Sequence, residues 1–148
     1  MRIEGIWGAD APFLRAFLVC EKLGIADYLI FLVDTGATST NILDRDAVRL
    51  RIDYTKLKRV KDGTIGIGGV VDTYILPQVK LYFRTAEGAL HEERLEELSV
   101  LKHMPKDRKE EEHIKRLPSL LGRDFLNRYK IILDRSNNRV TITDEPIL

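Results

Sequence analysis

A short apolar run that ends directly in an Asp-Thr-Gly tripeptide most restricts how this chain can fold. Residues 28–33 (YLIFLV) form the run, and Asp34-Thr35-Gly36 follows without a break. A run that is apolar on both faces is typical of a strand buried on both sides, so we expect a central strand that delivers Asp34 at its end. Asp34 would then lie on a rigid support at the mouth of a cleft, where Gly36 allows another backbone to come close.

The remaining pattern predicts a mainly β protein with one or two short helices. One helix is expected to begin at Asn41 or Asp44 and to end near Leu50, and a second is expected over residues 120–128. Runs of apolar and β-branched residues bounded by turn residues predict strands at 13–20, 28–33, 79–84, 129–134 and 139–143.

Two segments between these elements are less regular. Residues 64–75 are rich in β-formers but are interrupted by three glycines, so we predict a mobile hairpin rather than a core strand. Residues 91–101 favour a strand over an amphipathic helix. Nine of the eleven residues from 106 to 116 are charged, which predicts an exposed loop or helix that packs little.

Composition excludes several classes of protein. The length of 148 residues suits one domain spanning 1–148. The 24 Lys and Arg residues nearly balance the 23 Asp and Glu residues, so no net field attracts nucleic acid. The longest apolar stretch, residues 29–33, is too short to cross a membrane.

The cysteine and histidine content bears on location and on metals. Cys20 is the only cysteine, so no intrachain disulfide can form and a reducing, cytoplasmic location is expected. The N-terminus lacks a signal pattern. His91, His103 and His113 have no metal-ligand spacing, so we predict surface histidines, no metal and no cofactor.

Two further motifs follow the Asp-Thr-Gly motif. Gly66-Ile67-Gly68-Gly69 is a glycine-rich stretch that could form a flexible hairpin and cover a cleft. The sequence LLGRDFL at residues 120–126 joins an apolar pair to a glycine and a short helix. With FLVDTGATST at residues 31–40, these motifs make the chain resemble the retropepsin-like aspartic proteases, of which the retroviral proteases are the best known.

The resemblance extends from about Phe13 to Thr143, although only the motifs are specific. It implies a closed-barrel acid-protease fold in which Asp34 is the catalytic aspartate and Thr35 braces two active loops across a dimer axis. It also assigns the cleft lining to Gly36, Ala37 and Thr38, the flap to Gly66, Ile67, Gly68 and Gly69, and the support beneath the active loop to Leu121, Gly122 and Arg123, with a short helix beginning near Arg123.

The chain departs from the retroviral pattern in two places. The position of Thr38 is an aspartate in retroviral members, where it pairs with the arginine that matches Arg123 and contacts the substrate backbone. Thr38 cannot supply that charge, so Arg123 must find another partner or remain solvated. The charged segment at 91–116 is longer than its retroviral counterpart. It is expected either to decorate the outer face or to restrict access to the cleft.

One aspartate per chain implies two chains. Attack by water on a peptide bond needs a base and an acid at once, and one carboxyl cannot serve as both. Asp134 follows an apolar run but precedes Arg135-Ser136, and Asp62-Gly63 lacks a preceding strand. We therefore expect a homodimer acting on a peptide or protein substrate. In relatives the chain ends form the interface, a role for which Ile3, Ile6, Ile142 and Ile147 are candidates here.

The principal alternative is a dimeric peptide-binding module of the same fold that is catalytically weak or inactive, because a fold does not establish activity. The intact Asp34-Thr35-Gly36 motif favours catalysis. Thr38 and the long charged segment leave room for a binding module. A purely structural protein would need neither a flap nor a polar active loop.

Overall fold

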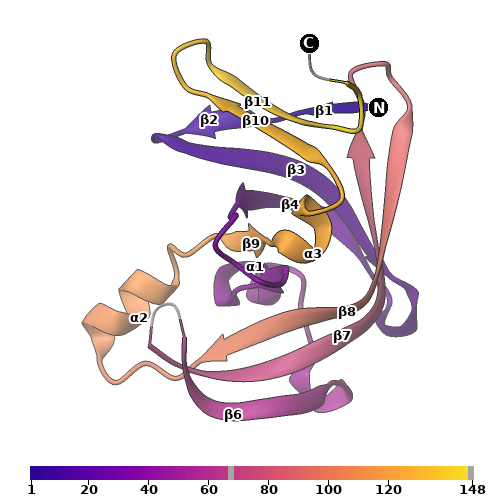
Figure 1. The fold of residues 1–148 in the computed structure, drawn as a ribbon. Coiled ribbons are helices and arrows are strands. Elements are labelled where there is room, and N and C mark those ends of the chain that lie inside the picture. Colours follow the sequence, from indigo (N-terminus) through magenta and orange to yellow (C-terminus); the bar gives the residue numbers. More distant parts are fainter. Residues whose placement is uncertain (67–68, 147–148) are drawn as a thin grey trace.

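The fold is built almost entirely from β-strands, as the sequence pattern predicts (Figure 1). The computed structural model describes residues 1–66 and 69–146. The helices are α1 (Asp44–Arg49), α2 (Arg108–Ile114) and α3 (Arg123–Leu126), with 3-10 turns at Glu21–Leu23 and Tyr54–Lys56. The strands are β1 (Arg2–Glu4), β2 (Ile6–Gly8), β3 (Ala11–Cys20), β4 (Ile25–Val33), β5 (Asn41–Ile42), β6 (Lys58–Gly66), β7 (Gly69–Arg84), β8 (Leu90–His103), β9 (Ser119–Leu121), β10 (Lys130–Asp134) and β11 (Arg139–Thr143).

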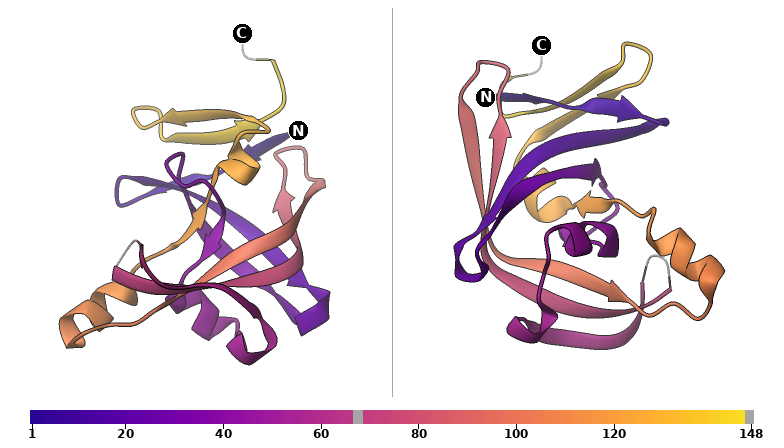
Figure 2. Two further views of the ribbon diagram at one scale, coloured as in Figure 1. Left: turned by 60° about the horizontal axis from the view of Figure 1, so that its bottom comes forward. Right: turned by 180° about the vertical axis from the view of Figure 1, so that it is seen from behind.

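Six of these strands close into a ring, which confirms the predicted barrel. The order β3-β4-β9-β5-β8-β7 is completed by pairing of β7 back onto β3 (Figure 2). The β4–β9 and β5–β8 pairs are parallel, and the other pairs in the ring are antiparallel. Closure of the ring leaves fewer strand edges open to pairing with other molecules.

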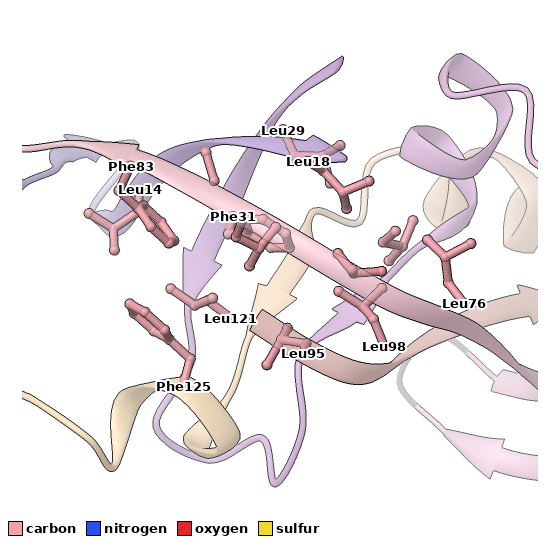
Figure 3. Close-up of a cluster of buried hydrophobic side chains, with 14 of the residues drawn as sticks. Leu14, Leu18, Leu29, Phe31, Leu76, Phe83, Leu95, Leu98, Leu121 and Phe125 are labelled. Carbon is pink, nitrogen blue, oxygen red and sulfur yellow. The ribbon is translucent and has the colours of Figure 1, made fainter. Parts of the chain in front are cut away.

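Alternation along the strands places one set of side chains inside the barrel. In β3, Leu14, Ala16, Leu18 and Cys20 are buried while the residues between them are more exposed. Figure 3 shows the core that results, with side chains from β3, β4, β7, β8, β9 and α3 meeting one another. The rings of Phe83 and Phe125 stack with centroids 5.1 Å apart, which fixes α3 against the barrel.

The hairpin predicted over residues 64–75 is present, formed by β6 and β7. Strand β7 runs unbroken from Gly69 to Arg84, so the predicted strand at 79–84 is only its C-terminal part. Val71 is buried, so the segment is not wholly outside the core, contrary to the prediction. Gln78, at φ 51°, is skipped in the pairing with β8 and marks an irregularity that the glycines of the sequence do not indicate. The mobility of the hairpin stays a prediction.

The predicted helix at 120–128 is also too long. Leu120 and Leu121 belong to β9, which pairs in parallel with β4, and the helix begins only at Arg123. Pairing with β4 buries both leucines, and this tertiary contact outweighs their helix preference. The predictions for α1 and for a strand over 91–101 are confirmed.

The two ends of the chain meet in a second, three-stranded sheet ordered β1-β11-β10. Ile3 pairs with Ile142 in this sheet, and both side chains are buried within the single chain. These two residues are therefore not available as interface contacts, contrary to the expectation from relatives. Ile6 is 62% exposed and stays a candidate, while Ile147 lies outside the described residues.

A buried carboxylate ties β8 to the segment that follows α3. Glu93 is 5% exposed and bonds with His91 Nε2 at 2.7 Å, Arg128 Nη1 at 2.7 Å and the Tyr129 hydroxyl. Burial by itself would raise the pKa of Glu93, but the hydrogen bonds from Tyr129, His91 and Arg128 together lower it below its usual value. The charged form of this group therefore stabilises the folded chain.

Substitution of Glu93 by glutamine is expected to make stability less dependent on pH. A depressed carboxyl pKa contributes stability above the unfolded-state pKa of about 4.3, and that contribution is lost as the pH falls through the folded-state value. At pH 7 the variant should lose about 1–3 kcal/mol of unfolding free energy. Denaturant unfolding at pH 7 and pH 3.5 measures this, with the exposed Glu96→Gln as control. An equal loss at both pH values would contradict the assignment.

Candidate active site

Asp34 lies where the sequence places it, at the end of a central barrel strand. Val33, the last residue of β4, pairs with Leu121 of β9, and the Asp34 amide donates to the Leu121 carbonyl at 3.0 Å. The chain then turns sharply, because Gly36 N donates to Asp34 Oδ1 at 2.9 Å and Ala37 N donates to the Asp34 carbonyl at 3.2 Å. The carboxylate is thereby held in one orientation by its own loop.

The segment at 122–124 lies against the loop that follows Asp34. Arg123 N donates to the Ala37 carbonyl at 2.9 Å, and Asp124 N donates to the Thr38 carbonyl at 3.2 Å. Gly122 approaches so closely that a Cβ added there would lie 2.4 Å from the carbonyl carbon and oxygen of Ser39. The position therefore requires glycine because of this close approach of two backbones.

Two supporting residues were missed by the sequence analysis. The Asp124 carboxylate accepts from Thr40 N at 3.0 Å and from Thr40 Oγ1 at 2.7 Å. Thr40 is fully buried, and its hydroxyl also accepts from Gly122 N at 3.1 Å. The one signal in the sequence is an aspartate in the first turn of a short helix, a place where carboxylates commonly accept from backbone amides.

Arg123 finds two uncharged partners in place of the missing aspartate. Its Nη1 donates to the Thr35 carbonyl at 2.9 Å, and its Nη2 donates to Thr38 Oγ1 at 3.2 Å. Among the side chains described, those of residues 1–60 and 69–146, no carboxylate forms an ion pair with it. The arginine thus still ties the two ends of the active loop together, but through hydrogen bonds to neutral oxygens rather than through a salt bridge.

The top of the loop is open in the single chain. Asp34 is partly exposed, while Thr35 and Gly36 are exposed. In the described part of the chain, the Thr35 hydroxyl has no hydrogen-bond partner and no second carboxylate contacts Asp34. The same part contains no group of three His, Cys, Asp or Glu side chains that could hold a metal ion.

His103 is buried against Asp44, so the prediction of a surface histidine was wrong there.

The glycine-rich motif lies at the end of the β6–β7 hairpin. Gly66 pairs with Gly69, whose φ of +120° is rarely adopted by residues with a side chain. Ile67 and Gly68 lie outside the described residues. The hairpin is therefore present where the resemblance places a flap, while its tip residue is not described. No described helix is long and apolar enough to span a bilayer.

Comparison with known proteins identifies the fold. No protein-family model and no curated protein matches the sequence. A solved retropepsin-like aspartic protease from Rickettsia conorii is similar over 96% of this chain and 89% of that chain, with 20% identity and a TM-score of 0.56. The EIAV protease, solved with the inhibitor HBY-793, is similar over 84% of this chain and 95% of that chain, with 20% identity and a TM-score of 0.47. The first similarity shows that this chain has the retropepsin-like fold.

Proposed function

We propose that this chain is one half of a homodimeric aspartic endopeptidase in which Asp34 of each of two copies forms the catalytic pair. The observation that carries the proposal is the Asp34 carboxylate itself, held by Gly36 N at the end of a central strand of a retropepsin-like barrel. The proposal treats residues 1–148 as one protease unit. Its substrate is a peptide or protein chain, and it requires no metal or cofactor.

The chemistry follows from two carboxyl groups held close together. One carboxylate removes a proton from a water molecule, while the other, protonated, donates to the carbonyl oxygen of the peptide bond. Repulsion between two like charges keeps one proton on the pair, and aspartic proteases are a standard example of this effect. The two ionisations belong to the pair rather than to either residue. The hydrogen bonds that hold each loop in place keep the two carboxyl groups oriented.

Exposure of the active loop supports the dimer. Thr35 and Gly36 are exposed in the single chain, and the Thr35 hydroxyl lacks a partner among residues 1–66 and 69–146. In the proposed dimer these residues meet their copies across a two-fold axis. The β6–β7 hairpin, with Gly66, Ile67, Gly68 and Gly69, acts as the flap over the bound peptide. Cys20 is buried and unpaired, which fits a reducing, cytoplasmic setting.

Thr38 favours the second candidate, a dimeric peptide-binding module with weak or no turnover. Its hydroxyl is engaged with Arg123, and it offers no carboxylate to a peptide. A catalytic pair and a pure binding site differ in whether their carboxyl groups must hold a proton between them. Binding alone does not need a shared proton, whereas hydrolysis does.

Activity should depend on protein concentration if two chains build one site. Hydrolysis of a peptide library, measured per chain, is expected to rise with concentration across the range where analytical ultracentrifugation shows dimers forming. A statine-type transition-state mimic should inhibit it, because such mimics bind far more tightly than substrates. Constant activity per chain in samples that contain only monomers would contradict the dimeric site. Peptide binding without any hydrolysis would favour the second candidate.

A further inference from the structure

The segment at 104–118, here called the α2 segment, joins the flap hairpin to the strand beside Asp34. It leaves β8 at His103, which pairs with Val71 of the hairpin, and Met104 N donates to the Val70 carbonyl at 3.0 Å. It returns at Ser119 of β9, the neighbour of β4. Both views of Figure 2 show α2 beside the end of the β6–β7 hairpin. The charged segment therefore lies next to the hairpin rather than on a distant face of the protein.

The return end of the α2 segment is firmly fixed. Ser119 is fully buried, and its hydroxyl donates to Asp46 Oδ2 at 2.6 Å and accepts from Leu43 N at 3.1 Å. Ile114, the last residue of α2, is also buried. Helix α2 is thus attached to the body of the protein at one side while it lies against the hairpin at the other.

Glu110 makes the contact between α2 and the hairpin. Asp107 caps the helix by accepting from Glu110 N at 2.8 Å. A glutamate three residues after such a cap commonly returns its carboxylate to the cap amide. Here the carboxylate instead faces the hairpin, since a Cβ added at Gly69 would lie 2.8 Å from Glu110 Oε1. A residue with a Cβ at position 69 would therefore require the Glu110 carboxylate to move aside.

The Glu110 oxygen is buried and lacks a hydrogen-bond partner in the described part of the chain. A buried acceptor without a partner costs about 1–3 kcal/mol, so its presence calls for a reason. A carboxylate packed against the backbone of the hairpin limits how near β7 can come to α2.

We propose that Glu110 is a positioning residue that sets where the β6–β7 hairpin lies, acting through Gly69. Its catalytic consequence rests on the proposed function, because a hairpin in the wrong place would bind a peptide poorly. Its structural consequence does not. The position of the hairpin strand should depend on Glu110 whether or not the protein cleaves peptides.

Hydrogen exchange tests the structural part directly. Glu110→Ala is expected to change the exchange rate of the β7 amides at 70–73 by about tenfold, because the hairpin strand can then shift toward α2. The matched control is Glu111→Ala on the same helix, whose carboxylate is exposed and pairs only with Lys115. Equal exchange in Glu110→Ala, Glu111→Ala and the parent protein would overturn the proposal, even if cleavage is normal.

A double-mutant cycle tests the link to Gly69. Gly69→Ala introduces both backbone strain at φ +120° and a contact that displaces the Glu110 carboxylate, and only the contact is removed by Glu110→Ala. The KM of the double variant should therefore be about tenfold lower than the product of the two single effects, with kcat changed less. Additive effects would overturn the proposal. If Gly69→Ala does not fold, the exchange result for Glu110→Ala decides alone. Changed exchange with no cleavage in any variant would instead refute the proposed function.

Discussion

Replacement of Asp34 by asparagine is expected to lower kcat/KM for peptide cleavage at least about a thousandfold while peptide affinity changes little. Asparagine keeps the shape of the side chain, and its oxygen can still accept from Gly36 N as Asp34 Oδ1 does at 2.9 Å. It can neither remove a proton from water nor share one with the other copy. Steady-state kinetics and peptide binding by calorimetry, carried out on the same preparation, measure the two effects separately.

Asp134→Asn is the matched control for this substitution. Asp134 also ends an apolar strand, β10, but its carboxylate accepts from Ser136 Oγ and from the amide groups of Asn137 in a surface turn. The control should lose some stability and no catalytic rate. If the two variants cleave peptides equally well, Asp34 is not the catalytic group and the peptide-binding module becomes the better account.

Replacement of Gly122 by alanine is expected to lower the unfolding free energy by about 3 kcal/mol or more and to remove activity. The added Cβ would lie 2.4 Å from the Ser39 carbonyl and 3.0 Å from the Ala37 carbonyl oxygen. Both obstacles are backbone atoms, so neither can turn aside as a flexible side chain would. The active loop must move away from α3, which breaks the bonds that hold Asp34. Denaturant unfolding together with peptide cleavage measures the result.

Gly88→Ala separates this collision from ordinary glycine effects. Gly88 has a φ of +91°, yet nothing lies within 4 Å of a Cβ added there. Its replacement should cost only the strain of an unfavourable φ, about 1–2 kcal/mol, and should leave activity unchanged. Gly122 has an ordinary extended backbone at φ −100°, so its whole effect comes from contact. Similar losses in the two variants would show that the close approach to Ser39 is unimportant.

The sequence was sufficient to predict the active loop because its signals are local. The apolar residues at 28–33 must be buried on both faces, and the polar residues that follow cannot continue such a strand. A turn stabilised by the bond from Gly36 N to Asp34 is therefore found at the end of β4, and Gly122 lies against the residues that follow it. The resemblance to retropepsins added the barrel, which periodicity alone could not distinguish from other β folds.

The features that sequence could not supply are contacts between distant segments. Strand β9 was read as part of a helix because leucines suit both, and only the neighbouring β4 decides between them. The role of Asp124 depends on its hydrogen bond with Thr40, and the role of Glu110 depends on its close approach to Gly69. His103 was predicted to be exposed because nothing nearby in the sequence indicates that Asp44 covers it.

The parallel insertion of β9 between β4 and β5 has a consequence for the order in which a nascent chain matures. Asp34 emerges from the ribosome early, but the carbonyl of Leu121 and the carboxylate of Asp124 that shape its loop are synthesised much later. Until these residues are synthesised, the loop lacks the hydrogen bonds that support it. In the protease proposed here, translation itself would delay the appearance of the catalytic site in unfinished copies of the chain.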